Sequence, residues 1–183
     1  MPGISQALRK LVEVLDEVHI PHMLIGGYAL PAYGRIRATL DVDVAIAAPF
    51  SEVVKLHKSL RERGFQLPSS PQRDAPLFVL TDLENKVEIE VWTKPDGIVF
   101  DDELLRRRLK VRPFDDDFEM FAIGPEDFIV NKLARKDRGV QDEQDVVSVL
   151  KRRKENLDHD YLARRAKHAD VSGLLRTLMA KVT

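Results

Sequence analysis

Apolar residues recur along the first part of the chain at spacings that distinguish helices from strands. Pro21 and the pair Gly26-Gly27 interrupt the pattern. The run Met23-Leu24-Ile25 between them predicts a short buried strand that ends in a glycine turn. An amphipathic helix is predicted before Pro21 from apolar side chains at four- and three-residue intervals, at Ile4, Leu8, Leu11, Leu15 and Val18.

The stretch after the glycine turn predicts a helix, a strand and a second helix. Residues 28–33 can begin a helix that Gly34 caps, and a strand is predicted from Leu40 to Ile46. Ser51 is the expected N-cap of the next helix, and Gly64 is its expected C-cap. Helices and strands therefore alternate here, as they do in an α/β protein.

The middle of the chain is predicted to be mainly extended. Alternating apolar and polar residues predict a strand pair over 77–81 and 86–93, after a loop rich in proline and serine. Asp101 or Asp102 can cap a short helix over 103–109. Extended pieces are expected over 111–114 and 118–123.

Helical patterns fill the rest of the chain from Pro125 onward, over 125–136, 141–153, 158–169 and 171–181. The predicted fold class is therefore α/β, with a mixed sheet flanked by helices and a C-terminal helical section. We expect an α/β core over 1–124 and a helical section over 125–183 that packs on it.

Composition excludes several classes of function. The 183 residues include 29 Lys and Arg against 30 Asp and Glu, a net charge of −1, so total charge does not indicate a nucleic-acid-binding protein. Cysteine is absent, which excludes disulfides, thiol catalysis and cysteine-ligated zinc. No signal segment and no run of about 18 apolar residues occurs, so we expect a cytoplasmic protein without a membrane span.

The candidate chemistry begins with two aspartates in the second predicted strand. Asp41 and Asp43 stand at alternate positions, so a strand would direct both carboxylates to one face. The turn at Gly26-Gly27 leads into a helix start, where backbone N–H groups can approach a phosphate. Two carboxylates facing such a turn suit a magnesium–nucleotide site. An edge strand with a solvated acidic face would show the same alternation.

A third acid is predicted on a later strand. Glu88 and Glu90 alternate with apolar residues, so both face away from the apolar side of their strand. If this strand pairs beside the first acidic strand, one glutamate can join Asp41 and Asp43. The alternative is that both glutamates lie on a solvated sheet face.

The order of these features resembles the DNA polymerase β-type nucleotidyltransferase superfamily in its minimal form. The stretch Arg-x-Thr-x-Asp-x-Asp, which contains Arg37 and Thr39, is similar to that of abortive-infection type IV toxin nucleotidyltransferases and related uncharacterised bacterial proteins. The resemblance covers about residues 20–150. It selects Glu90 as the third acid, in a position where the relatives more commonly have aspartate.

The resemblance also implies a set of site residues and an activity. The enzyme would transfer a nucleoside monophosphate from an NTP to an acceptor hydroxyl, with two Mg²⁺ held by the catalytic acids Asp41, Asp43 and Glu90. Lysine and arginine followed by Asp-x-x-Asp match a helical motif of the relatives, at Lys132, Arg138, Asp142 and Asp145. The implied nucleotide-binding residues are Gly26, Gly27, Arg37, Thr39, Lys132, Arg138 and Asp142. Arg37 can alternatively fix its own loop by bonding a carboxylate.

The acceptor and partners stay open at this point. Basic segments over 106–112 and 151–154 suit an RNA backbone, or equally a solvated helix end. The first hypothesis is a toxin-like transferase acting on tRNA or another RNA, with an antitoxin protein as partner. The second is a transferase acting on a small molecule or a protein. The third is a degenerate nucleotide-binding or interaction module.

Overall fold

The structure is a computed structural model that describes residues 2–114 and 117–182, and in these residues seven strands form one mixed sheet. The strands are β1 (His22–Ile25), β2 (Asp43–Ile46), β3 (Phe65–Gln66), β4 (Leu77–Asp82), β5 (Val87–Trp92), β6 (Leu109–Val111) and β7 (Met120–Ala122). Their order in the sheet is β3-β4-β5-β2-β1-β7-β6. β2 runs antiparallel to β1 and parallel to β5, which brings the two acidic strands side by side.

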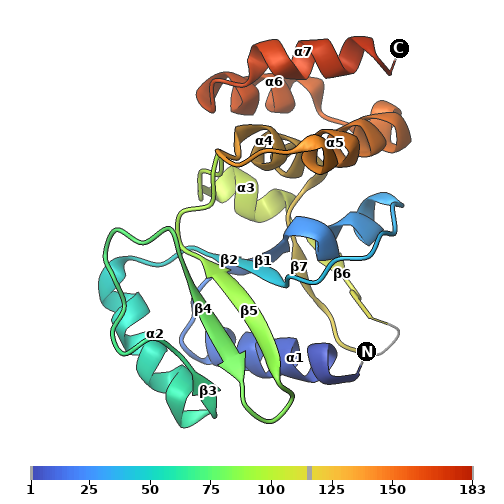
Figure 1. The fold of residues 1–183 in the computed structure, drawn as a ribbon. Coiled ribbons are helices and arrows are strands. Elements are labelled where there is room, and N and C mark those ends of the chain that lie inside the picture. The colour runs from blue at the N-terminus through green and yellow to red at the C-terminus, as the bar shows by residue number, and fades with distance from the viewer. Residues whose placement is uncertain (1, 115–116, 183) are drawn as a thin grey trace.

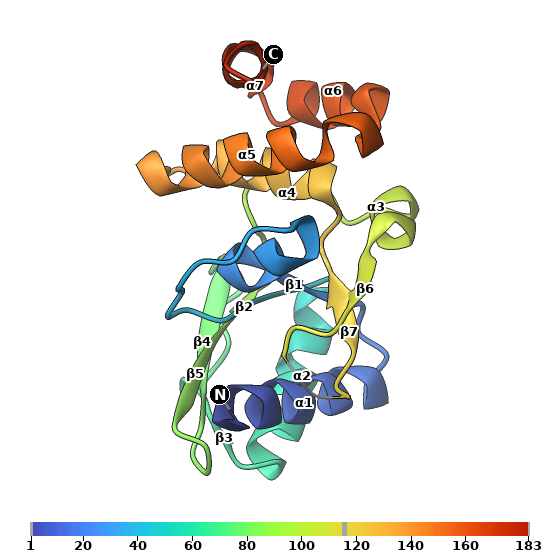
Figure 2. The same ribbon diagram turned by 90° about the vertical axis from the view of Figure 1, so that its right-hand side faces the viewer.

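Helices cover the sheet on two sides. They are α1 (Pro2–Glu17), α2 (Phe50–Glu62), α3 (Asp102–Arg107), α4 (Pro125–Ala134), α5 (Val140–Arg153), α6 (His159–His168) and α7 (Ser172–Ala180), with 3₁₀ turns η1 (Gly26–Tyr33) and η2 (Lys154–Asn156). Figures 1 and 2 show the sheet curving around α1 and α2, while α4 to α7 stack beyond its other side. This mixed sheet with flanking helices confirms the predicted fold class.

The core lies where the predicted apolar stripe of α1 meets the sheet. Leu8, Leu11 and Leu15 are fully buried, and α1 packs against α2 and β5. On β5 the predicted alternation holds, because Ile89 and Val91 are fully buried, whereas Glu88 and Glu90 are not. Burial of these apolar side chains is the main favourable term in forming the sheet.

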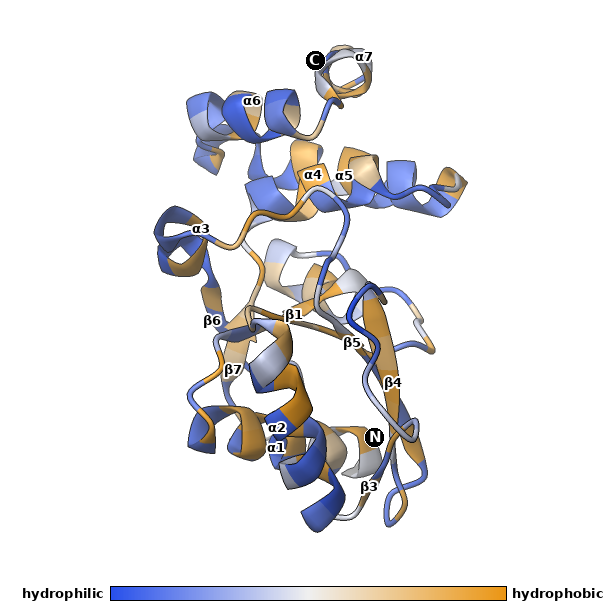
Figure 3. Ribbon diagram, turned by 90° about the vertical axis from the view of Figure 1, so that its left-hand side faces the viewer, coloured by the Kyte–Doolittle hydropathy of each residue, from blue (hydrophilic) through white to orange (hydrophobic). Residues whose placement is uncertain are grey.

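The helical section contacts the core through η1 and α4. The Tyr33 hydroxyl donates a hydrogen bond to the Ile123 carbonyl, and its ring lies 5.0 Å from the ring of Phe128 in α4. Figure 3 shows an apolar α4 enclosed between the core and the more hydrophilic α6. The division into 1–124 and 125–183 stays a prediction.

Three local predictions differ from the structure. β2 begins at Asp43, not at Leu40, because residues 35–42 form a loop in which Leu40 is 93% exposed. Pro49, not Ser51, is the N-cap of α2, since its extended backbone leads directly into Phe50. The stretch after the glycine turn is a 3₁₀ helix that begins at Gly26 and contains Pro31, which has no N–H to donate.

Two predicted caps are present. Gly34 ends η1 with a φ of +83°, a left-handed conformation that glycine adopts readily. The Asp101 side chain caps α3 by accepting a hydrogen bond from the Leu104 N–H at 2.8 Å. Among the helices of the described ranges, none has the length and apolar character needed to cross a membrane.

Candidate active site

The two glycines of the predicted turn lie directly against the acidic loop and strand. Gly26 has a φ of +65°, and a Cβ at this position would lie 2.0 Å from Oδ2 of Asp43. A Cβ on Gly27 would lie 2.6 Å from Oγ1 of Thr39. Side chains on either residue would therefore collide with the loop and strand opposite. The Gly-Gly sequence is needed here because the backbone and the Asp43 carboxylate approach so closely.

Asp43 and Glu90 form a carboxyl pair at the centre of the sheet. They are partners in the parallel register of β2 and β5, so their side chains leave the same face. Burial raises the pKa of both side chains, and the charge of Asp43 raises the pKa of Glu90 further. Two acids that interact this closely cannot both ionise without cost, and a bound cation would offset that cost.

Trp92 orients the Asp43 side of this pair. Its indole Nε1 donates a hydrogen bond to Oδ1 of Asp43 at 3.1 Å, and this bond works against the rise in the Asp43 pKa. Trp92 lies two residues after Glu90 and faces the same side of the sheet. Its place on this face follows from the alternation of the strand, whereas the contact with Asp43 depends on the register between β2 and β5.

Asp41 lies beside the pair but is not part of it. Its charge contributes to the raised pKa of Glu90, although it lies in the loop before β2. Asp41, Glu88 and Glu90 border one open cavity of about 600 Å³, together with Leu40, Val79 and Leu83. Within residues 2–114 and 117–182, no group of three or more acidic, histidine or cysteine side chains is arranged to hold a metal. The structure therefore brings Asp43 and Glu90 together, with Asp41 at their edge.

A second, narrow space separates Asp43 from the helical section. It measures about 20 Å³ and is bordered by Asp43, Trp92, Asp96, Asn131 and Arg135, among others. The sequence analysis did not identify Asn131 and Arg135. The two residues stand four positions apart, at the end of α4 and directly after it, so they lie on the same side of this helix. The positive charge of Arg135 lowers the pKa of Asp43, and the reciprocal effect helps to raise the pKa of Arg135.

Arg138, chosen from the sequence motif, lies elsewhere. It donates to the Leu133 carbonyl at 2.6 Å and lies 3.7 Å from the Glu143 carboxylate. It thus joins the end of α4 to the start of α5. Arg135, three residues earlier, borders the narrow space beside Asp43.

Lys132, Asp142 and Asp145 form a buried ionic cluster between α4 and α5. Nζ of Lys132 lies 2.8 Å from Asp142 and 3.7 Å from Asp145. Arg37 reaches Asp145 with two nitrogens, at 3.2 Å and 3.0 Å, and Arg35 lies 3.4 Å from it. The loop that leads to Asp41 is therefore attached to α5 by arginine–carboxylate contacts. In this structure Arg37 fixes its loop by bonding a carboxylate.

The sequence pattern of the nucleotidyl transferase family of unknown function DUF2204 matches residues 4–175. The chain belongs to this family. A comparison with proteins of curated function finds no match. Membership agrees with the predicted resemblance to minimal nucleotidyltransferases, and it identifies the chain as a nucleotidyl transferase at the level of the family.

Solved structures share the fold of this family member. A nucleotidyltransferase-like antigenic protein from Paracoccidioides brasiliensis superposes with a TM-score of 0.54 at 18% identity, covering 98% of this chain and 93% of the other. The antibiotic-resistance factor ANT(2'')-Ia, in its solution structure, gives a TM-score of 0.53 at 13% identity over 97% and 94% of the chains. Its complex with adenylyl-2''-tobramycin gives 0.51 at 14% identity, over 97% and 95%. At these identities the likeness concerns the fold.

Proposed function

We propose that this nucleotidyl transferase moves a nucleoside monophosphate from an NTP to a hydroxyl group of a small organic acceptor, with Mg²⁺ as cofactor. The observation that carries the proposal is the carboxyl pair of Asp43 and Glu90, held against the Gly26-Gly27 turn. A half-buried pair of acids without an ion-pair partner is costly to keep in a structure unless it has a use.

The donor set at the pair suits a hard divalent cation. Asp43 and Glu90 supply carboxylate oxygens from neighbouring strands, and Asp41 is near enough to raise the pKa of Glu90. These three acids are the residues that would hold the two Mg²⁺ ions of the proposal. When bound, the cations would neutralise the acids, offset the negative charge of the NTP phosphates and favour ionisation of the acceptor hydroxyl.

The chain's own residues would position the phosphates. Gly26 lies against Asp43 and Gly27 lies against Thr39, so the backbone of this turn is next to the acid that would hold the metal, and its N–H groups are the donors proposed for the phosphates. Lys132 and Arg135 both lower the pKa of Asp43 through their charge, which indicates that a triphosphate beside Asp43 would lie within their field. A space of about 20 Å³ holds about one water molecule, so Arg135 must move aside when a nucleotide enters.

The acceptor side favours a small molecule over RNA. The cavity of about 600 Å³ next to Glu90 combines apolar side chains with Asp41, Glu88 and Glu90 against Lys86. Such a lining repels phosphate groups and accommodates a neutral or cationic molecule. ANT(2'')-Ia, which shares the fold, has been crystallised with an adenylylated tobramycin.

The predicted RNA track over 106–112 is occupied by internal contacts. Arg107 lies 2.5 Å from Asp158, and Arg108 donates to the His22 carbonyl at 2.7 Å. Lys110 and Arg112 both pair with Glu119. These cations support the fold. The segment therefore gives no support to the hypothesis of a tRNA acceptor and an antitoxin partner.

Nucleotide labelling tests the proposal directly. The protein is incubated with α-phosphate-labelled NTPs and Mg²⁺, in parallel with total tRNA and with hydroxyl-bearing small molecules that include aminoglycosides. We expect the label on a small molecule and none with EDTA. Label on tRNA would reject the proposed acceptor but keep the transferase activity. A cell lysate is tested as a further source of acceptors. If no label appears on any of these acceptors and the protein shows no Mg²⁺-dependent NTP binding, a non-catalytic module is favoured.

A further inference from the structure

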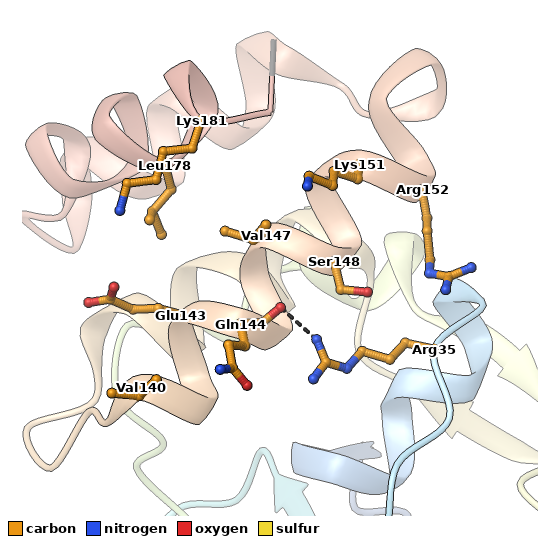
Figure 4. Close-up of a pocket in the computed structure, with 10 residues that line it drawn as sticks. All are labelled: Arg35, Val140, Glu143, Gln144, Val147, Ser148, Lys151, Arg152, Leu178 and Lys181. Carbon is orange, nitrogen blue, oxygen red and sulfur yellow. Dashed lines mark hydrogen bonds between the residues drawn. The ribbon is translucent and has the colours of Figure 1, made fainter.

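A second cavity lies away from the acid pair, between α5, α7 and Arg35. It has a volume of about 560 Å³ and shares no lining residue with the spaces beside Asp41, Asp43 and Glu90. Figure 4 shows its lining residues, with Arg35, Lys151 and Arg152 arranged around the Ser148 hydroxyl and Val147 towards the centre. The volume falls within the range typical of small-molecule sites.

The lining of this cavity carries unbalanced positive charge. Arg35, Lys151, Arg152 and Lys181 border it, against one acid, Glu143. Glu143 has its own partner, since its carboxylate lies 3.7 Å from Arg138. Among the described residues, Lys151, Arg152 and Lys181 form no ion pair or side-chain hydrogen bond. Several unpaired cations around one cavity lower the free energy of an anion placed there.

The cavity also has an apolar wall. Leu178 of α7 is 1% exposed, whereas Val140 at the start of α5 is 74% exposed. Val147 lies beside Leu178 on the cavity side of α5, as Figure 4 shows. Val147 stands four residues before Lys151 on the same helix, so an apolar side chain and an unpaired cation share one face, which suits a ligand that has both an apolar body and a charged end.

We propose that this cavity binds a small organic phosphate of about the size of a nucleoside diphosphate. The phosphate groups would lie among Arg35, Lys151 and Arg152, where guanidinium and ammonium groups can donate charge-assisted hydrogen bonds. The apolar body would contact Val147 and Leu178. This site is separate from the proposed NTP site at Asp43, and it goes beyond the proposed transfer reaction.

The arrangement of the basic segment favours a compact ligand over an RNA strand. Arg153, the next cation after Arg152, donates to the Ala32 carbonyl at 2.5 Å and is not free to contact a ligand. Lys151 and Arg152 therefore border one cavity together with Lys181, and Lys154 is the exposed cation of this segment that lies outside the cavity. A strand that tracks its phosphates along a protein needs a longer row of cations.

Binding of ADP in EDTA tests the proposal, because chelation removes the Mg²⁺ needed at the acid pair. The probes are ADP and adenosine, measured by isothermal titration calorimetry. The test variant carries Lys151→Glu, Arg152→Glu and Lys181→Glu, all at exposed positions. Arg35 is left unchanged because it also contacts Asp145. The matched control carries Lys55→Glu, Arg106→Glu and Lys167→Glu, which change the net charge equally at exposed positions outside the cavity.

We expect ADP to bind the unmodified protein at least about tenfold more tightly than adenosine does. The test variant should lose at least about tenfold in ADP affinity, while the control variant and Asp43→Asn keep it within about threefold. Circular dichroism verifies that each variant is folded. Three results would overturn the proposal: no ADP binding by the folded parent protein, equal losses in the test and control variants, or unchanged binding in the test variant. Binding of a short RNA in place of ADP, lost in the test variant, would also overturn it and assign the cavity to an RNA backbone.

Discussion

Two acidic clusters, one buried and one half-buried, lie close together in this structure, and their charges are balanced differently. Asp142 and Asp145 are surrounded by Lys132, Arg35 and Arg37. Burial favours a higher pKa for Asp142, but hydrogen bonds from the Gly139 N–H and from Lys132 outweigh it, so the pKa of Asp142 is lowered..

The other cluster, Asp43 and Glu90, has no cation of its own within hydrogen-bonding distance among the described residues. The pKa of each carboxyl is raised by burial, and the polar partners of Asp43 are a second acid and an indole N–H. Balanced charge of the first kind holds elements together, whereas unbalanced charge of the second kind is what a cation-binding site requires. The comparison therefore supports a structural role for one cluster and the catalytic role that we propose for the other, and four predictions test this assignment.

The largest effect is expected on removing a charge from the unbalanced pair. Asp43→Asn should reduce nucleotidyl transfer by about 10³-fold or more, since a cation loses a charged ligand. In EDTA the same variant should leave the free energy of unfolding unchanged or raise it by up to about 1 kcal/mol, because two close acids become one. Labelled-nucleotide transfer and denaturant unfolding measure the two effects.

Glu90→Gln and Glu88→Gln form a matched pair for the same test. Both residues leave the same face of β5, but only Glu90 is the register partner of Asp43. We expect Glu90→Gln to act like Asp43→Asn and Glu88→Gln to retain transfer within a few-fold. The reverse result would mean that Glu88 is the third acid. If Asp43→Asn greatly lowers the free energy of unfolding but leaves nucleotidyl transfer intact, the pair has a structural role and not a catalytic one.

The next largest effect concerns the balanced cluster. Lys132→Met leaves Asp142 and Asp145 buried without the ammonium between them, and should lower the free energy of unfolding by about 3–5 kcal/mol. Urea denaturation measures the change, with Arg138→Met as a control that should cost less than about 1 kcal/mol, since Arg138 is exposed. A stable Lys132→Met protein that only fails to transfer nucleotide would place Lys132 with the catalytic residues instead.

The sequence was informative about the acidic strands and much less so about the helical section. Alternation on β5 predicted which face Glu90 leaves, and the resemblance to nucleotidyltransferases selected Glu90 over Glu88, whereas the register that sets Glu90 beside Asp43 is a matter of strand pairing. The position of Asp41 was not predictable in this way, since it depends on Arg37 holding the preceding loop to Asp145. Arg135 was missed for the same reason: which cation faces Asp43 depends on how α4 packs on the core.

Asp127 is an intermediate case, a buried acid with one neutral partner, Tyr161, and one cation, Arg165, whose Nε lies 3.6 Å from its carboxylate. Tyr161 donates a hydrogen bond to it at 2.7 Å, while burial raises its pKa to about 6. The unfolded chain ionises near the ordinary pKa of about 3.9. Between these values the folded state holds more protons than the unfolded state, so stability should fall as pH rises from about 4 to 6. The loss is on the order of 3 kcal/mol and is complete above that range.

Denaturant unfolding at a series of pH values measures the slope of the unfolding free energy against pH, and Asp127→Asn isolates the part of that slope that Asp127 contributes. Asparagine can still accept the Tyr161 hydrogen bond but does not ionise, so the variant should show a clearly flatter pH dependence. Asp43 and Glu90 add to the slope with the same sign, because their pKa values are also raised. An unchanged slope in Asp127→Asn would show that Asp127 is already ionised in the folded protein at low pH.

The smallest effect is expected at Trp92, which touches the unbalanced pair without belonging to it. Trp92→Phe keeps an aromatic ring but removes the N–H that holds Oδ1 of Asp43. Loss of a partner that orients a metal ligand should raise the Mg²⁺ concentration needed for half-maximal transfer by about tenfold, and high Mg²⁺ should restore the transfer rate. Unfolding free energy should change by about 1 kcal/mol. Transfer rates measured against Mg²⁺ concentration separate this role from stacking on a nucleobase. A stacking residue would tolerate phenylalanine at every Mg²⁺ concentration and fail only as Trp92→Ala, because the ring rather than the N–H would then be the group that binds.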